Sequence, residues 1–239
     1  MRIRISLDLT NKKIPVNYRS LIQGVIYNCL FADKNSKQIH DYGYKLEKRK
    51  FKLFTFSELY GNAKYDSKTK ELLFLSDAYF EVSAYDENLI LAIINFITQN
   101  RKIIILNEKV SILSVSFIDE NGFDDTMMEF ITSSPITVYN VTDDKKTNYF
   151  HPTSLEFCDG IIKNLSKKYY LIYGENMPEI KIESITNFKQ KRVYFRKNFS
   201  IAYHCNIKIS GLTNKIYRVV ITCGLGSKNS SGFGMVRKK

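Results

Sequence analysis

The sequence predicts an α+β fold in which two β-α-β-β-α-β units follow one another along the chain. The first observation is the order of patterns, since strand, helix, strands, helix and strands occur once before residue 122 and return more loosely after it. The second is an acidic, turn-like segment at residues 119–125 that separates the two sets. The third is length, because 239 residues suit one large domain or two small ones that each bury a core. We therefore predict two tandem ferredoxin-like (RRM-like) domains, at residues 1–122 and 123–239.

The first half opens with a strand, because polar and apolar residues alternate from Arg2 to Leu9. Pro15 precedes a helix that we expect over about residues 16–31. Asp86 is in position to cap an apolar helix over residues 88–98. The other strands of this half are expected at residues 52–56, 71–75, 78–84, 102–106 and 109–117.

The second half repeats this order with one gap. A helix is expected at about residues 154–169, after a lead-in that contains His151 and Pro152. Residues 211–215 leave little room for a second helix, so the apolar run that follows them is predicted as a strand. The expected strands of this half are residues 127–132, 136–141, 179–185, 193–196, 199–209 and 216–223.

Charge and aromatic content favour a nucleic-acid partner. The chain has 36 Lys and Arg against 24 Asp and Glu, a formal charge of +12, and neutralising phosphates releases condensed counterions. The 16 Tyr and 16 Phe offer rings on which unpaired bases can stack, although most of them are expected to serve the core. Membrane-surface binding and simple basicity remain alternative interpretations of the charge alone.

The composition also disfavours several classes of protein. No apolar run is long enough to cross a bilayer, and the chain opens as a strand instead of a cleavable signal, so we expect a cytoplasmic protein. The four cysteines lack the spacing of a zinc site and are expected to be reduced and buried. The paired aspartates at 124–125 and 143–144 look like turn residues, which disfavours a two-metal nuclease.

Residues 224–234, GLGSKNSSGFG, carry the strongest local signal. Two G-x-G pairs, Gly224 with Gly226 and Gly232 with Gly234, give a backbone that can adopt positive φ and approach a ligand closely. Such a loop can present N–H groups to phosphates, and Lys228 adds a positive charge. A dinucleotide site is excluded because only five residues follow the last glycine, and a P-loop because Gly-Lys-Ser/Thr before a helix is missing. An ordinary glycine-rich hairpin is the alternative.

The tail continues into G-F-G-M-V, and further segments match the same family in the same order. These segments are residues 21–28 (LIQGVIYN), 52–57 (KLFTFS), 130–138 (FITSSPITV) and 154–170, which contains NLSKKY. Together they resemble the CRISPR-associated protein six family, the CRISPR repeat-processing endoribonucleases of the repeat-associated mysterious protein superfamily. The resemblance implies tandem ferredoxin-like domains, binding of the repeat RNA and one metal-independent cut per repeat, with no cofactor.

Such a cut uses the ribose 2′-OH as the nucleophile. It needs a proton acceptor near that hydroxyl, a proton donor for the leaving 5′-oxygen and positive charge at the phosphorane. Of the three histidines, His151 leads into a helix and His204 lies on the polar face of a strand. In the family a catalytic histidine follows the first helix and precedes the Lys-Leu-Phe strand, a position that His40 matches. A histidine, with an ordinary pKa of about 6.5, suits a general acid.

Tyr27 stands out on the first predicted helix. The apolar stripe of that helix consists of Tyr18, Leu21, Ile22, Val25, Ile26, Cys29 and Leu30. At about 100° per residue Tyr27 falls nearly opposite the middle of this stripe, where it could meet RNA. Some relatives carry a tyrosine in the matching I-Y-N context that acts on the 2′-OH. The alternatives are that Tyr27 only orients the hydroxyl or packs against the second domain.

Lys52 begins the Lys-Leu-Phe segment and matches the lysine that some relatives use to stabilise the transition state. Because further basic residues lie between His40 and Lys52, Lys48 or Lys50 could supply this charge instead. We expect RNA contacts from the four glycines and Lys228, and from Lys48, Lys50, Arg192 and Arg196.

The resemblance implies precursor and processed CRISPR RNA as partners. Subunits of a CRISPR effector complex and a second copy of the chain are further candidates. A non-catalytic RNA-binding subunit of an effector complex remains the main alternative function, and a general RNA-binding protein of the same fold the weaker one.

Overall fold

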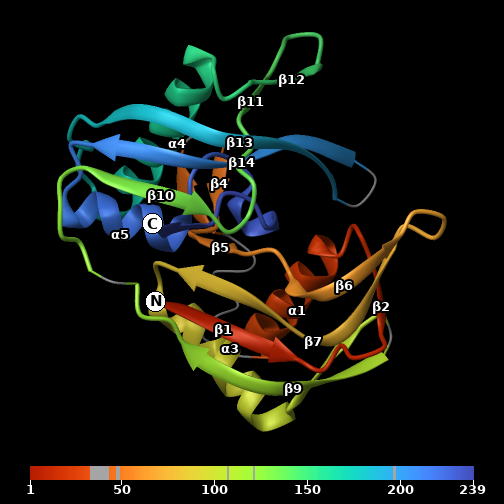
Figure 1. The fold of residues 1–239 in the computed structure, drawn as a ribbon. Coiled ribbons are helices and arrows are strands. Elements are labelled where there is room, and N and C mark those ends of the chain that lie inside the picture. Colours follow the sequence, from red (N-terminus) through yellow and green to blue (C-terminus); the bar gives the residue numbers. More distant parts are fainter. Residues whose placement is uncertain (33–42, 47–48, 107, 121, 196–197) are drawn as a thin grey trace.

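The computed structural model describes residues 1–32, 43–46, 49–106, 108–120, 122–195 and 198–239, and it shows an α+β protein whose two halves are each built on an antiparallel sheet (Figure 1). The predicted residues His40, Lys48 and Arg196 lie outside this part of the chain. In the view of Figure 1 the second half, drawn from green to blue, lies above the first, drawn from red to yellow-green.

The first half is a sheet in the order β2-β7-β1-β9-β8, with β5 and β6 paired to β7. β1 is antiparallel to both of its neighbours, β7 and β9. The helices of this half are α1 (Arg19–Ala32) and α3 (Glu87–Asn100). Its strands are β1 (Arg2–Leu7), β2 (Lys13–Pro15), β3 (Tyr44–Leu46), β4 (Arg49–Phe51), β5 (Phe54–Phe56), β6 (Tyr60–Asp66), β7 (Glu71–Ala84), β8 (Lys102–Ile105) and β9 (Glu108–Phe117).

The second half is a sheet in the order β13-β14-β10-β15, with a small separate hairpin of β11 and β12. Its helices are α4 (Leu155–Tyr173) and α5 (Asn214–Cys223), followed by one 3-10 turn, η1 (Asn229–Ser231). Its strands are β10 (Met128–Thr132), β11 (Tyr139–Val141), β12 (Thr147–Tyr149), β13 (Lys181–Phe195), β14 (Asn198–Ser210) and β15 (Val236–Lys238).

Local signals place the helix ends. Asp86 accepts a hydrogen bond from the Asn88 amide at 3.0 Å and begins α3, as the sequence predicts. Ser154 caps α4 in the same way by accepting from the Phe157 amide, and Gly174 ends that helix at φ 71°. The predicted helices at 16–31, 88–98 and 154–169 are therefore confirmed, with shifted ends.

The predicted strand at residues 216–223 is wrong, because these residues form α5. Thr213 caps the helix by accepting from the Ile216 amide, so residues 211–215 serve as its turn and N-cap. α5 lies between the sheets of the two halves (Figure 1), and its residues Ile216, Tyr217 and 219–223 are buried. The exposed polar residues of α5, Asn214, Lys215 and Arg218, all lie in its first five positions, so the run at 219–223 is continuously buried and resembles a buried strand in sequence.

In two places the prediction divides what is one strand in the structure. Residues 71–75 and 78–84 belong to one strand, β7, and residues 179–185 and 193–196 to one strand, β13. In β13 the polar middle stays in the sheet through a bulge between Thr186 and Lys189, where Asn187 adopts φ 52°. Pairing with β14 on either side of the bulge therefore carries the strand through a stretch that the sequence suggests is a loop.

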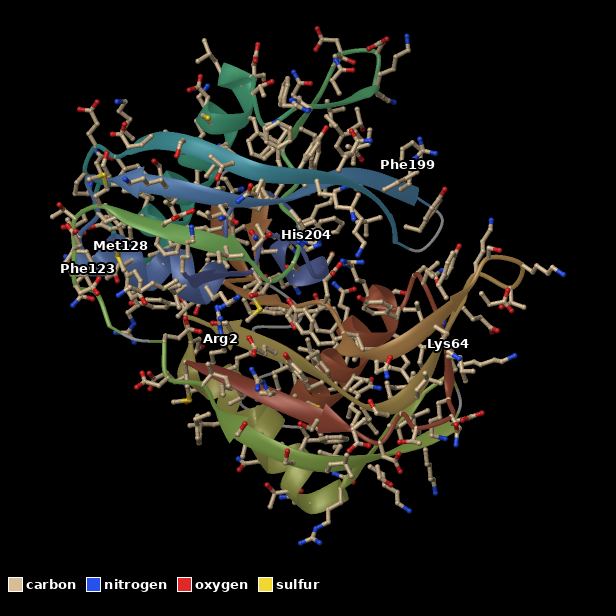
Figure 2. The ribbon with its side chains drawn as sticks, viewed as in Figure 1. Arg2, Lys64, Phe123, Met128, Phe199 and His204 are labelled. Carbon is tan, nitrogen blue, oxygen red and sulfur yellow. The ribbon has the colours of Figure 1, made fainter. Side chains whose placement is uncertain are left out.

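The halves have separate apolar cores that meet along a shared boundary. Leu53, just before β5, belongs to the core of the second half. The Arg2 guanidinium on β1 donates to the Val236 carbonyl at 2.6 Å and to the Ile221 carbonyl at 3.3 Å. Figure 2 shows Arg2 at this boundary. Of the helices described, none has the length and apolar character needed to span a bilayer.

Candidate functional site

A row of polar side chains on α1 faces the second half of the molecule. Arg19 and Gln23, one turn apart, are both buried although neither belongs to the apolar stripe. The Arg19 guanidinium donates to the Gly232 carbonyl at 3.2 Å, and the Gln23 amide donates to the Ser230 carbonyl at 2.6 Å. Tyr27 continues the row by one more turn. This face of α1 therefore lies along the glycine-rich loop.

Tyr27 lies beside Lys52 at the end of this row. The Lys52 Nζ is 5.3 Å from the centre of the Tyr27 ring, and the edge of that ring contacts Phe54, with 6.2 Å between the ring centres. Both residues are half-buried. Tyr27 is thus less exposed than its position opposite the apolar stripe suggests, because β5 covers part of its ring. The structure nevertheless brings together two of the three predicted catalytic residues.

A pocket of about 530 Å³ opens next to Lys52, between the two halves. Four lysines line it and, among its lining residues, there is no carboxylate. Its walls come from the start of β5, from β11, from α4 and from the glycine-rich loop. The lining residues are 50–54, 139–141, 164, 168, 223 and 227–230. This excess of positive charge suits a phosphate-bearing ligand.

The glycines hold the loop of residues 224–234 closely against the protein. All four have positive φ, between 66° and 82°. A Cβ on Gly234 would lie 1.9 Å from the Leu225 carbonyl oxygen, and one on Gly232 would lie 2.5 Å from the Phe56 ring of the first half. The Leu225 amide donates to the Gly234 carbonyl at 2.8 Å, which closes the loop on itself. These contacts favour bracing between the halves as the role of the glycines.

The middle of the loop is its accessible part. Lys228, at φ 58°, donates to the Ser200 hydroxyl at 2.8 Å and lies over the Tyr139 ring, with 4.7 Å to the ring centre. Gly224, Gly226 and Gly234 are buried beneath it. Phosphate contacts from this loop would therefore come from residues 227–231.

Lys168 on α4 supports the loop from below. Its side chain is buried, and Nζ donates to the carbonyl of Gly224 at 2.7 Å, with those of Cys223 and Gly226 at 3.4 and 3.5 Å. Burial lowers the pKa of Lys168 to about 8. The prediction missed this residue. The available signal was its position three residues after Leu165, on the buried stripe of a helix where a lysine is unexpected.

A cluster of charges centred on Glu58 joins the halves. One carboxylate oxygen accepts from Arg19 Nη2 and Lys191 Nζ, each at 2.5 Å, and the other lies 3.3 Å from His204 Nε2. The other ring nitrogen of His204 lies 3.1 Å from the Thr132 hydroxyl. Figure 2 shows His204 where the upper sheet faces the first half. His204 thus contacts protein groups at the boundary of the halves.

The predicted RNA-binding residue Arg192 and the histidine His151, which was not predicted as a site residue, both lie apart from the pocket. Arg192 is exposed on β13, and its guanidinium lies 5.4 Å from the centre of the Phe199 ring. The imidazole Nδ1 of His151 lies 2.8 Å from the Thr153 hydroxyl, and the ring packs edge-on against Tyr203. Lys50, in contrast, lines the pocket with Lys52.

Two family models match this chain. The model described as CRISPR associated protein Cas6, C-terminal, matches residues 118–238, and the model described as CRISPR-associated protein Cas6, N-terminal, matches residues 13–116.

Two proteins from archaea are similar along nearly the whole sequence. The CRISPR-associated endoribonuclease Cas6 of Pyrococcus furiosus is 27% identical over 233 residues, which cover 94% of this chain and 83% of that protein. The CRISPR-associated endoribonuclease Cas6 1 of Methanocaldococcus jannaschii is 27% identical over 259 residues, covering 99% and 92%.

Solved structures share the fold. One described as a Cas6-related gene product from Pyrococcus furiosus superimposes with a TM-score of 0.86 at 23% identity, covering 100% of this chain and 98% of that chain. One described as an RAMP protein binding different RNA substrates gives 0.83 at 22% identity, covering 100% and 99%.

Proposed function

This chain belongs to the Cas6 family of CRISPR-associated endoribonucleases, with an N-terminal and a C-terminal Cas6 domain, and on that basis we propose that it cuts CRISPR precursor RNA once within each repeat to give guide RNAs. The observation that carries the proposal is the position of Lys52, beside Tyr27 and at the edge of a lysine-lined pocket between the halves.

The proposed reaction needs no metal ion. The 2′-OH attacks the adjacent phosphate, and the products carry a 2′,3′-cyclic phosphate (or 3′-phosphate) and a 5′-OH. Lys52 stabilises the charge of the phosphorane. Tyr27 accepts the proton of the 2′-OH or orients that hydroxyl, and His40 donates a proton to the leaving oxygen. His40 lies along the chain between α1, which carries Tyr27, and Lys52, which precedes β5. This position supports its proposed role.

The RNA is proposed to follow the basic surface around the pocket. Lys50 and Lys228 line the pocket and are placed to contact phosphates. Arg192, together with Lys48 and Arg196, would add phosphate contacts further along the RNA. The glycines contribute by fixing the shape of the loop that presents Lys228.

We further infer that each half is a ferredoxin-like domain, with a boundary at residues 122/123. The strand orders β6-β7-β1-β9 and β13-β14-β10-β15, each with two helices in β-α-β-β-α-β chain order, support this assignment. The family supports a cytoplasmic protein with CRISPR RNA as its partner, and effector subunits or a second copy of the chain as further partners.

The test is cleavage of the source organism's CRISPR repeat RNA in EDTA. We expect a single cut that leaves a 5′-OH, and loss of the cut with His40→Ala or with a 2′-deoxy nucleotide at the cleavage site. Lys52→Met should lower kcat by about 100-fold or more while RNA binding changes little, because the charge acts mainly in the transition state. Lys64→Met is the matched control, since Lys64 is exposed at the far edge of the first half (Figure 2).

Other outcomes separate the alternatives. Tight binding of the repeat without a cut by the wild type would favour a non-catalytic RNA-binding subunit. A cut that EDTA abolishes would contradict the metal-independent mechanism. Failure to bind the repeat better than a scrambled RNA would reject the proposed substrate.

A further inference from the structure

One acceptor among the residues that line the pocket has no hydrogen-bond partner in the described part of the chain. Asn164 lies on α4, one turn before Lys168, and both residues line the pocket. The side-chain oxygen of Asn164 is buried and makes no hydrogen bond within the described part of the chain. A buried acceptor left unpaired destabilises the protein, so such an atom is expected to bind something in the working protein.

The Lys168 amine, one turn further along α4, donates to backbone carbonyls and not to Asn164. Lys168 Nζ donates to the backbone carbonyl of Gly224 and lies within reach of those of Cys223 and Gly226. It is directed at the glycine-rich loop, and it holds the wall of the pocket. Asn164 as a whole is only half-buried and lines the pocket, so rotation of its side chain would bring the oxygen to a donor that enters the pocket.

The rest of the pocket indicates what kind of ligand carries that donor. Lys50, Lys52 and Lys228 also line it and give it a positive charge. Tyr139 contributes an aromatic ring that is half-buried. A volume of about 530 Å³ lies within the range of small-ligand pockets, about 300–1,000 Å³. An anionic group with an attached planar ring that bears N–H donors fits these features, and a nucleotide is such a ligand.

We propose that this pocket binds one unpaired nucleotide of the RNA next to the cleavage site, with Asn164 accepting a hydrogen bond from its base. The lysines hold the phosphates, and the base enters between β11 and α4. Single-stranded RNA is commonly recognised through bases that leave the stack and bond along their edges. Asn164 is then a specificity-determining residue outside the catalytic group, and this assignment rests on the proposed function.

The test combines Asn164→Leu with changes to single bases. The probe is the CRISPR repeat RNA with a 2′-deoxy nucleotide at the cleavage site, so that binding is measured without a cut. At each position near the cut, one amino group is removed by replacing guanosine with inosine, adenosine with purine riboside, or cytidine with a pyrimidinone riboside. Asn148→Leu, on the exposed hairpin strand β12 and outside the pocket, is the control.

We expect one position where loss of the amino group weakens binding to the wild type and to Asn148→Leu by about tenfold. Asn164→Leu should bind the unmodified RNA about tenfold more weakly and show no further loss at that position, because the two changes remove the same hydrogen bond. Thermal unfolding of each variant checks that Asn164→Leu is folded.

Two results would overturn the proposal. If Asn164→Leu binds every RNA as the wild type does, the Asn164 oxygen bonds only to water. If it weakens binding but keeps the full penalty at every modified base, Asn164 acts on the fold or on the backbone of the RNA. Either result would leave the proposed function standing, because cleavage by the wild type tests that function separately. A wild type that does not bind the repeat better than a scrambled RNA would remove the proposed function and the pocket assignment with it.

Discussion

Glu58 is a single carboxylate that holds charges from both halves of the molecule. Burial by itself would raise its pKa, but the hydrogen bond with His204 and the charges of Arg19 and Lys191 outweigh burial and hold the pKa of Glu58 well below its ordinary value of 4.5. A carboxyl group of this kind stabilises the fold fully above its unfolded pKa, and the contribution is lost as pH falls. The contribution of Glu58 to the free energy of unfolding should therefore decrease as the pH is lowered.

Glu58→Gln should lower the free energy of unfolding by about 3 kcal/mol at pH 7, because it leaves the buried Arg19 without a counter-charge. The difference from the wild type should shrink as pH falls from about 4.5 through the lowered pKa, since the unfolded chain takes up a proton at Glu58 first. Urea unfolding at neutral and acidic pH measures it. The control is Glu156→Gln, an exposed position on α4. A difference that stays constant from pH 7 to acid would contradict the assigned role.

At the scale of elements, the glycine-rich loop contacts both halves of the molecule. It begins where α5 ends, closes on itself between Leu225 and Gly234, and contacts α1 and β5 through Arg19 and Thr55. The Thr55 hydroxyl donates to the Phe233 carbonyl at 3.0 Å. The loop, α1 and β5 are thus fixed relative to one another, and these are the elements that place Tyr27 and Lys52.

Gly234→Ala should lower the free energy of unfolding by about 3 kcal/mol or more. The added Cβ meets the Leu225 carbonyl and the backbone stays at φ 70°, so backbone strain and overpacking add together. Gly174→Ala is a matched control, because Gly174 also has positive φ but its Cβ would meet no atom within 4 Å. That variant should lose only about 1 kcal/mol. Equal losses in urea unfolding would show that steric contact at Gly234 does not matter.

At the scale of the whole molecule, the charge of +12 predicts salt-dependent RNA binding. Every phosphate contact contributes to the slope of log Kd against log salt concentration. The lysines of the pocket lie where the two halves meet, so RNA bound there contacts both halves.

Lys228→Ala should reduce the magnitude of that slope by about 0.7–1, because one phosphate contact is lost. Anisotropy titrations with uncleavable repeat RNA between about 50 and 200 mM salt measure it. Lys64→Ala, which removes an exposed lysine far from the pocket, should leave the slope unchanged. A parallel shift of the line for Lys228→Ala, with the same slope, would mean that Lys228 does not contact a phosphate.

The sequence by itself determined most of the helices and strands of each half, and it indicated the family. Alternation in β1 and apolar periodicity in α1, α3 and α4 depend on local geometry, so these elements could be predicted. The ordered segments around Tyr27, Lys52 and the glycine-rich loop identified the family, and the roles of those residues follow as hypotheses.

Only the tertiary structure decided how the halves meet. Residues 219–223 resemble a buried strand in sequence, and only the structure shows them as the second half of α5, which begins at the Thr213 cap. Arg19 and Glu58 belong to no motif, and the NLSKKY segment that contains Lys168 does not show its contact, since the hydrogen-bond partners of these residues are more than 35 residues away along the chain. The sequence likewise does not show that the Asn164 oxygen is buried with no hydrogen-bond partner among the described residues. Contacts across a domain boundary join distant residues, and no local pattern encodes them.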